Sequence, residues 1–203
     1  MIYGKEIFAV AAAYALGCVS TGYYLTRLRT GKDIRQTGSG SAGARNVSRL
    51  LGKRWFAFTM GVDFFKGAAA TGLALCLGLE VWIAAVCVVA AVGGHIWPVQ
   101  LGFRGGKGVS AMFGGLSVLD LRLALAIVLI FGALYVLTRR YIVSGMIAIF
   151  ALPMTAVFLD CGWRSTWVLI VLTLMVLFAH RNNIHGAIQE GRARAGAVFG
   201  RGK

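Results

Sequence analysis

Residues 81–101 read VWIAAVCVVAAVGGHIWPVQL and contain no Asp, Glu, Lys or Arg. A helix needs about twenty predominantly apolar residues to cross the hydrocarbon core of a bilayer. This run has that length and that composition. The stretch therefore predicts a membrane-spanning helix, and similar runs stand on both sides of it.

The neighbouring apolar runs extend the same pattern along the chain. They are Ile7–Leu25, Trp55–Leu79, Leu121–Leu137, Ile142–Leu159 and Thr166–Ala179. The run Val109–Leu119 is too short to cross alone, so we expect a half-helix or a tilted segment buried in protein. Together the runs predict about seven helical segments, although hydropathy equally allows about five or six.

The composition indicates the same class of protein. Of 203 residues, 58% are hydrophobic and 14% are charged, whereas soluble domains average about 45–50% apolar and about 25% charged residues. We expect an all-α integral membrane protein with a single domain over residues 1–203. Lys5 precedes an apolar run as in a signal peptide, but no cleavage site with a soluble domain after it is found, which favours a retained first helix.

The cysteines have no ligand or disulfide pattern. Cys18, Cys76, Cys87 and Cys161 lie in or at the ends of apolar runs without CxxC spacing. Such cysteines are more often inert core residues. The sequence therefore predicts neither a metal site nor a cofactor.

The basic residues indicate how the chain crosses the membrane. Most Lys and Arg residues lie within 27–54, at Arg104 and Lys107, at Arg139 and Arg140, and after Ala179. The other ends hold Lys5, Arg122 and Arg164 beside Glu6, Glu80, Asp120 and Asp160. Because cytoplasmic loops are enriched in Lys and Arg, we expect the N-terminus outside and the C-terminus in the cytoplasm, provided that residues 109–119 cross. This placement explains the net charge of +14 better than nucleic-acid binding does.

A small, hydroxyl-rich and basic segment, TGSGSAGARNVSR at 37–49, follows the first run. Its relevant residues are the glycines Gly38, Gly40 and Gly43, the serines Ser39 and Ser41, and the arginines Arg45 and Arg49. Glycines permit positive φ and a close approach of the backbone to a ligand. Free N–H groups and hydroxyls can then surround an oxyanion, and Arg can bind phosphate in a bidentate manner. The segment is interpreted as a phosphate-binding loop.

The same segment has two other interpretations. The letters at 38–43 satisfy GxGxxG, but a dinucleotide site requires a βαβ unit around the motif. Long apolar runs stand there instead, and no alternation of strands and helices is found. A plain flexible loop between helices also fits the segment.

Three further polar clusters occur at the ends of apolar runs. Asp63 and Lys66 share a helix face at i, i+3, which fits a structural ion pair or a wall of an active site. His95 fits either a general base or a hydrogen-bonded residue at a helix end. His180 and Asn183 form a polar cap that also fits an interfacial role.

The cations Arg104 and Lys107 lie in a glycine-rich turn before residues 109–119. A Walker A loop would need Gly at Leu101 and Ser or Thr at Gly108, so that motif fails. The turn fits an anion site at a helix N-terminus, or an exposed cytoplasmic turn. Since all four clusters are expected on one membrane face, they predict a site for a phosphorylated, partly lipid-soluble substrate.

The order and spacing of these clusters resemble the PlsY family, the bacterial acyl-phosphate:glycerol-3-phosphate acyltransferases. The corresponding stretches are GSGSAGARNVSR at 38–49, VDFFKG at 62–67, GHIWPVQLGFRGGKGV at 94–109 and HRNN at 180–183. Three residues depart from the family pattern. Ser41 stands where the family usually has Asn, Arg45 where it has Thr, and Arg104 where it has Lys.

The resemblance implies a seven-helix fold in the bacterial inner membrane and transfer of an acyl group from acyl phosphate to glycerol 3-phosphate. It implies Ser39, His95 and Lys107 as catalytic residues. It implies substrate binding by Gly38, Gly40, Gly43, Asn46, Arg49, Asp63, Lys66, Arg104, Gly105, Gly106, His180 and Asn183. Direct attack by the sn-1 hydroxyl is expected, with His95 or an oxygen of the acyl phosphate as the base. The expected partners are these two small molecules and membrane lipid, without nucleic acid, and a monomer is expected.

One rival function is unsupported by the sequence, and another remains as an alternative. Other acyltransferases that form lysophosphatidic acid use a His-x4-Asp motif, but the fifth residue after His95 is Gln100 and the fifth after His180 is His185. A transporter for a phosphorylated anion also fits a basic mouth, but it predicts charged or broken helices near the bilayer midplane.

Overall fold

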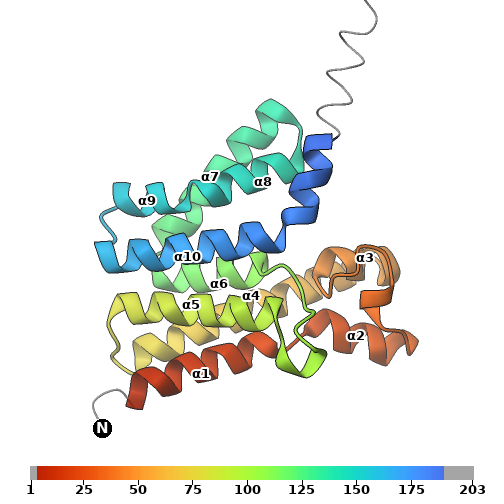
Figure 1. Cartoon of the computed structure of the whole chain (residues 1–203), viewed down its shortest axis with the longest axis horizontal. Coiled ribbons are helices and arrows are strands. Elements are labelled where there is room, and N and C mark those ends of the chain that lie inside the picture. The colour runs from red at the N-terminus through yellow and green to blue at the C-terminus, as the bar shows by residue number, and fades with distance from the viewer. Residues whose placement is uncertain (1–3, 190–203) are drawn as a thin grey trace, which may run out of the picture.

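The computed structural model describes residues 4–189, and within that range every regular element is helical. The α-helices are α1 (Gly4–Cys18), α2 (Thr21–Thr30), α3 (Ala44–Leu51), α4 (Lys53–Cys76), α5 (Val81–Ile96), α6 (Val109–Leu119), α7 (Leu121–Thr138), α8 (Tyr141–Phe150), α9 (Leu152–Phe158) and α10 (Trp163–Ala179). The short 3-10 helices are η1 (Ile34–Gln36) and η2 (Val99–Leu101). The prediction of an all-α membrane protein is confirmed (Figure 1). The basic tail residues Arg192, Arg194, Arg201 and Lys203 lie outside the described residues.

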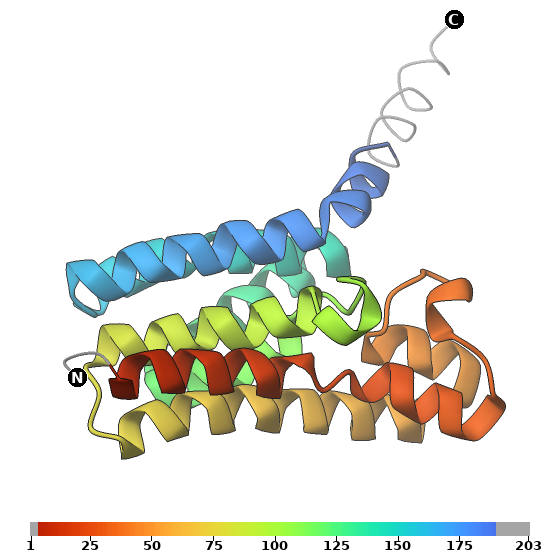
Figure 2. The ribbon, with the colours of Figure 1, turned by 60° about the horizontal axis from the view of Figure 1, so that its bottom comes forward.

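The long helices lie side by side, with α5 in the middle. Figure 2 shows α1 and α4 on one side of α5 and α10 on its other side. Helices α7, α8 and α9 pack against α6 and α10. The short α2 and α3 and the loops around them gather at the end of the molecule where α5 and α10 finish (Figure 1). The bulk of the protein is therefore a helical bundle that carries its irregular backbone at one end.

Three described helical segments are long and apolar enough to cross a membrane, or up to five if each bent pair counts as one span. Helix α6 is apolar but has only 11 residues. Helix α4 is not among them because it carries Asp63 and Lys66 in its middle. The predicted total of seven therefore stays a prediction.

Two of the predicted runs are interrupted in the structure. The run Ile7–Leu25 is divided at Val19 between α1 and α2. The run Ile142–Leu159 is bent by 42° between α8 and α9. Pro153 explains the second break, because its ring nitrogen cannot donate a hydrogen bond to Ile149. The hydroxyl of Thr173 on α10 donates to that Ile149 carbonyl at 3.5 Å, so the break is stabilised from a neighbouring helix.

Pairs of glycines hold two helix crossings at backbone contact. A Cβ at Gly67 on α4 would overlap the carbonyl oxygen of Ala111 on α6, and a Cβ at Gly114 on α6 would overlap the carbonyl oxygen of Phe64. In the same way, a Cβ at Gly17 on α1 would overlap the backbone of α5, and a Cβ at Gly94 on α5 would overlap the backbone of α1. Small residues permit such close packing in membranes, where lipid competes with apolar side chains for every surface.

We predict that Gly67→Ala and Gly114→Ala each destabilise the protein, because the added methyl must separate α4 from α6. Overpacking of this kind typically costs about 1–3 kcal/mol. The measurement is thermal unfolding in detergent micelles. Gly72→Ala is the matched control, since Gly72 lies on the same helix and a Cβ there would meet nothing within 4 Å. Equal melting temperatures for Gly67→Ala and Gly72→Ala would contradict the crossing.

Candidate active site

A cavity of about 720 Å³ lies at the end of the bundle that carries the loops. Its polar wall contains Ser39, Ser41, Arg45, Asn46, Arg49, Asp63, His95, Lys107, His180 and Asn183. Its apolar wall includes Phe56, Met60, Phe64, Phe113, Ile127, Phe131, Met146 and Ile149. Segments far apart in the sequence therefore meet around one space that has a cationic part and a hydrocarbon part.

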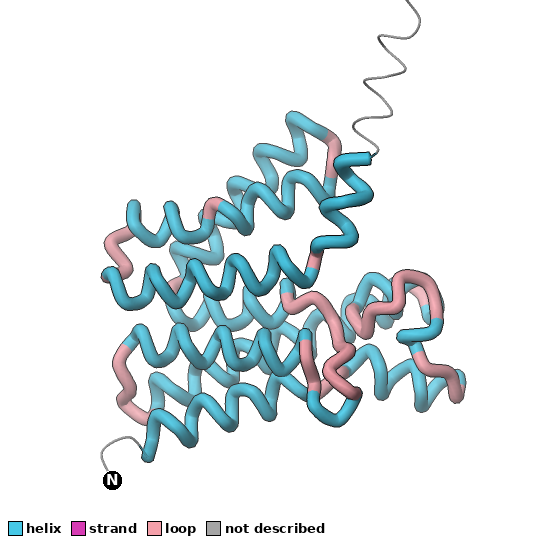
Figure 3. Tube along the Cα trace, in the orientation of Figure 1, coloured by secondary structure: helices cyan, strands magenta, loops and turns pink. Residues whose placement is uncertain are grey.

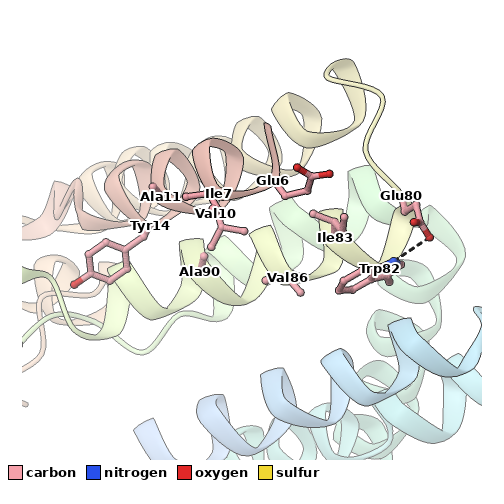
Figure 4. Close-up of a pocket in the computed structure, with 10 residues that line it drawn as sticks. All are labelled: Glu6, Ile7, Val10, Ala11, Tyr14, Glu80, Trp82, Ile83, Val86 and Ala90. Carbon is pink, nitrogen blue, oxygen red and sulfur yellow. Dashed lines mark hydrogen bonds between the residues drawn. The ribbon is translucent and has the colours of Figure 1, made fainter. Parts of the chain in front are cut away.

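A second cavity, of about 930 Å³, lies between α1 and α5 (Figure 4). Glu6 and Glu80 line it together with Trp82, whose Nε1 donates to the Glu80 carboxylate at 3.0 Å. The remaining lining residues are mostly aliphatic. Two carboxylates repel a phosphorylated ligand, and none of the predicted site residues lies there. The cationic cavity is therefore the candidate site.

Asn46 builds the loop that forms one wall of the site. Its Oδ1 accepts from the backbone N–H of Ser39 at 3.1 Å. Its Nδ2 donates to the carbonyls of Ile34, Thr37 and Ser41 at 3.1, 2.9 and 3.0 Å. The side chain is only 3% exposed. The amide groups of Asn46 are thus engaged with the loop itself, and the residue positions Ser39 rather than presenting a free amide to a ligand.

The three glycines of this loop do not behave alike. Gly38 and Gly40 have φ of +54° and +69°, as expected. Gly43 has φ of −84°, so it does not use the freedom to take a positive φ, and it precedes the first turn of α3. Gly38 leaves no room for a side chain, because a Cβ would overlap Oδ1 of Asn46.

The sequence predicted a loop for the whole segment, but the second half of it is helical. Helix α3 begins at Ala44, so Arg45 and Arg49 stand at i and i+4 on one face. Both arginines line the cavity. Their guanidinium groups therefore reach the same space from successive turns.

Lys107 enters the site from the loop between η2 and α6. Its Nζ donates to Oδ1 of Asn183 at 2.7 Å. Burial lowers the pKa of the Lys107 ammonium below its usual range, and the charges of Arg45 and Arg49 lower it further. These cations repel one another, so an anion placed between them would relieve the repulsion.

The loop carrying Lys107 is fixed to the loop after η1. The backbone N–H of Ala42 donates to the carbonyl of Gly105 at 3.1 Å, and Figure 3 shows the two loops side by side. Gly105 and Gly106 themselves donate to the carbonyls of Ile96 and His95 at 3.0 and 2.9 Å. Both glycines therefore support the turn and do not line the cavity.

Asp63, Lys66 and His95 form a buried network behind the cavity wall. The Lys66 ammonium lies 3.0 Å from Asp63 Oδ1, which confirms the predicted i, i+3 pair. It also lies 2.8 Å from His95 Nδ1 and donates to the carbonyls of Gly17 and Val19 at 3.0 and 2.9 Å. Asp63 and His95 line the cavity, whereas Lys66 does not.

The two histidines differ in the ring nitrogen that is available. An ammonium has no lone pair, so a neutral His95 ring would accept from Lys66 through Nδ1 and carry its proton on Nε2; the same Nδ1 lies 3.6 Å from Asp63 Oδ1. That Nε2 faces the backbone of Gly106, where a Cβ would overlap it. In His180, by contrast, Nδ1 lies 2.9 Å from the Val176 carbonyl and must donate, which leaves the lone pair on Nε2.

Arg104 is another predicted residue that does not line the cavity. Its side chain is exposed. It stands at the outer side of the same turn whose inner side carries Lys107. Within residues 4–189, no group of His, Cys, Asp and Glu has the arrangement of a metal site.

Sequence reasoning did not identify the apolar wall. Phe64, Phe113, Phe131 and Met146 lie in apolar runs and have the same hydropathy as lipid-facing neighbours. Their cavity positions follow only from how the helices cross. Aromatic content by itself gave no signal that distinguishes a cavity wall from a membrane surface.

Comparisons with known proteins agree on one family. The sequence profile described as "Glycerol-3-phosphate acyltransferase" matches residues 7–190. A protein of Desulfitobacterium hafniense, named glycerol-3-phosphate acyltransferase 1, is 40% identical over 189 residues, which cover 93% of this chain and 94% of that protein. A glycerol-3-phosphate acyltransferase of Synechococcus sp. CC9902 is 38% identical, with coverage of 95% and 96%.

Two solved structures share the fold. Both are crystal structures of PlsY (YgiH), an integral membrane glycerol 3-phosphate acyltransferase. The glycerol 3-phosphate form has a TM-score of 0.85 and 28% identity, and covers 92% of this chain and 94% of that one. The lysophosphatidic acid form has a TM-score of 0.82 and 27% identity, and covers 92% and 93%.

We predict that Lys66→Met strongly destabilises the protein, since it leaves the Asp63 carboxylate and two carbonyls buried without their cation. Breaking a buried ion pair typically costs about 3–5 kcal/mol. Adding Asp63→Asn should recover part of this loss, which a double-mutant cycle of unfolding free energies in detergent would measure. Lys53→Met, at the exposed start of α4, is the control and should change stability by less than about 0.5 kcal/mol. Strict additivity of Asp63→Asn and Lys66→Met would show that the pair is not coupled.

Proposed function

The chain belongs to the glycerol-3-phosphate acyltransferase (PlsY) family of bacterial integral membrane proteins, and from this premise we propose the reaction of its cavity. The enzyme transfers a fatty acyl group from acyl phosphate to the sn-1 hydroxyl of glycerol 3-phosphate. The products are 1-acyl-glycerol 3-phosphate and phosphate. The observation that carries this proposal is the union of a cationic wall and a hydrocarbon wall in a single cavity.

The cationic wall suits two phosphate groups. Arg45, Arg49 and Lys107 supply positive charge, and Ser39, on the loop held by Asn46, lies in the same wall. Asp63, the acidic residue in the wall, is neutralised by Lys66. The charges of Arg45, Arg49 and Lys107 are therefore available to a phosphate dianion, which favours binding of that dianion.

The hydrocarbon wall suits a fatty acyl chain. The side chains of Phe64, Phe113, Phe131, Met146 and Ile149 remove such a chain from polar contacts while its carbonyl remains near the cations. A donor that joins an acyl group directly to a phosphate would lie across the junction of the two walls. The carbonyl carbon is then placed where charge develops during attack.

The chemistry requires no covalent intermediate with the enzyme. The sn-1 oxygen forms the new ester bond to the carbonyl carbon, and the bond from that carbon to the phosphate oxygen breaks. Phosphate is a good leaving group, and Lys107 and Arg49 stabilise its charge and that of the oxyanion. Holding both reactants in one cavity supplies the further advantage of orientation.

The hydroxyl proton needs an acceptor other than His95. With Nδ1 occupied by the Lys66 ammonium, a neutral His95 ring would present an N–H and no lone pair toward the Gly106 side. An oxygen of the donor phosphate is the proposed base. This oxygen lies next to the carbonyl carbon, and the phosphate that carries it takes the proton as it leaves. His95 then acts by positioning the glycine turn that carries Lys107.

The proposed site faces the cytoplasm, and the working unit is a single chain. The basic residues at the loop end of the bundle support this orientation by the preference of Lys and Arg for cytoplasmic loops. In this topology the N-terminus lies outside.

The decisive experiment incubates the purified protein with palmitoyl phosphate and labelled glycerol 3-phosphate. Formation of 1-acyl-glycerol 3-phosphate with an equal amount of phosphate supports the proposal. Palmitoyl-CoA and palmitoyl thioester of acyl carrier protein are tested as competing donors, and transfer from them alone would contradict the acyl phosphate donor. A transporter would release no phosphate in this assay.

We predict that Lys107→Ala lowers kcat/KM by more than about tenfold, because loss of one group that stabilises developing charge typically costs a few kcal/mol. The measurement is steady-state release of phosphate. Lys53→Ala removes a cation at the exposed start of α4, outside the cavity wall, and should retain near-normal activity. An unaltered rate in Lys107→Ala would remove this residue from the site.

We predict that His95→Asn retains more than a tenth of the wild-type kcat, since the Asn oxygen can still accept from Lys66. A general base would cost about a hundredfold or more. The pH dependence of kcat distinguishes the two roles. Loss of an acidic limb together with a fall of that size would restore His95 as the base.

A further inference from the structure

Arg45 is a cation of the cavity that departs from the family-like motif. It stands on α3 where that motif has Thr, and its side chain is exposed at the cavity wall. Its guanidinium carbon lies 5.1 Å from the centre of the Tyr141 ring at the start of α8. Within residues 4–189 it forms no ion pair with a carboxylate. The contact with the Tyr141 ring is therefore the interaction that positions the Arg45 guanidinium.

Tyr141 marks one end of an apolar stripe on α8. Tyr141, Ile142, Gly145, Met146 and Ile149 all line the cavity, and their spacing places them on one face of the helix. Tyr141 is 57% exposed, whereas Ile149 is 3% exposed. The stripe thus runs from an exposed rim at Tyr141 to a buried floor at Ile149, with Arg45 above its rim.

Arg49 occupies a different place on the same helix. It lies one turn after Arg45 on α3 and makes no contact of this kind with α8. The cavity therefore offers one guanidinium at the head of the apolar stripe and another a turn away from it.

The two substrates place their phosphates at different distances from the reacting carbonyl. In acyl phosphate, the phosphate is bonded directly to the carbonyl carbon at the head of the chain. In glycerol 3-phosphate, three carbon atoms separate the phosphate from the attacking oxygen. A cation at the head of the apolar stripe is suited to the first phosphate, and cations farther along are suited to the second.

We propose that Arg45 is a donor-specific phosphate clamp that Tyr141 holds in a waiting position. On binding of acyl phosphate, the guanidinium leaves the Tyr141 ring and makes a bidentate contact with the donor phosphate, while the acyl chain follows the α8 stripe. The inference rests on the proposed function and adds to it which substrate Arg45 recognises.

The exchange is favourable on simple physical grounds. A cation–π contact at an exposed site is a weak interaction. Charge-assisted, bidentate bonding of Arg to phosphate is stronger and more directional. The anion also relieves the repulsion among Arg45, Arg49 and Lys107. The weak contact with Tyr141 therefore costs the donor little to displace.

The test compares Michaelis constants for the two substrates in Arg45→Thr. We expect the KM for palmitoyl phosphate to rise by about tenfold or more, in keeping with loss of a charged hydrogen bond. The KM for glycerol 3-phosphate should stay within about twofold of the wild type. Arg45→Lys keeps the charge without the fork and should fall between the two proteins.

Arg54→Thr is the matched control. Arg54 also lies 5.1 Å from the centre of an aromatic ring, that of Trp55, but it does not line the cavity. Its replacement should leave both Michaelis constants unchanged.

Direct binding separates this inference from the proposed function. The non-hydrolysable phosphonate analogue of palmitoyl phosphate is titrated into the wild type and Arg45→Thr in detergent, and its Kd should also rise by about tenfold in the variant. If Arg45→Thr does not fold, Arg45→Lys and Arg45→Gln are measured in its place. A wild-type Kd in both variants would overturn the inference.

Other outcomes identify which statement is wrong. If the wild type consumes palmitoyl phosphate and Arg45→Thr has the wild-type KM for it, the clamp is overturned while the proposed function stands. An equal or larger rise for glycerol 3-phosphate would place Arg45 at the acceptor and would also overturn it. If the wild type transfers acyl groups only from thioesters, the proposed function itself fails.

Discussion

The buried ammonium of Lys66 is the interaction on which the loop end of this bundle depends. It joins Asp63 on its own helix, His95 at the end of α5, and the carbonyls of Gly17 and Val19 where α1 stops. A helix that ends inside a membrane protein leaves carbonyl groups without partners, and these are costly in a medium that lacks water. Lys66 supplies those partners and a positive charge at the negative end of the α1 dipole. The break between α1 and α2 is thereby stabilised, and the Lys66 ammonium connects α1, α4 and α5.

Backbone hydrogen bonds connect the loops of the site to the network around Lys66. His95 supports the turn of Gly105 and Gly106, which in turn holds the loop organised by Asn46 through the bond between Ala42 and Gly105. Each loop can come so close because its glycines carry no Cβ. Lys107 and Ser39 therefore reach the cavity from loops whose positions are set by a polar network under them. Preorganisation of this kind places charge before the substrate arrives, so less free energy is lost to ordering during the reaction.

The membrane explains why the cavity combines such different walls. In the proposed reaction, a fatty acyl donor would come from hydrocarbon and glycerol 3-phosphate from water, so the reacting atoms would meet at a boundary between the two. The α8 stripe supplies the hydrocarbon side, and α3 with the Lys107 loop supplies the aqueous, cationic side. The tight crossings at Gly67 with Gly114 and at Gly17 with Gly94 keep the bundle rigid below this boundary.

The sequence by itself determined the helical membrane class, the places of the polar clusters and the pairing of Asp63 with Lys66, because hydropathy and i, i+3 spacing are local properties. It also predicted that Ser39, Arg49, Lys107 and Asn183 lie together, and the structure brings all four to one cavity. Only the tertiary structure decided that Asn46 is engaged with its own loop, that Arg104 faces outward, and that Phe64 and Phe113 line a cavity and not lipid. The physical reason is that lipid and protein interior are equally apolar, so hydropathy cannot distinguish them. The partners of Lys66 and of His95 lie many residues away, and only the packing of helices brings them within hydrogen-bonding distance.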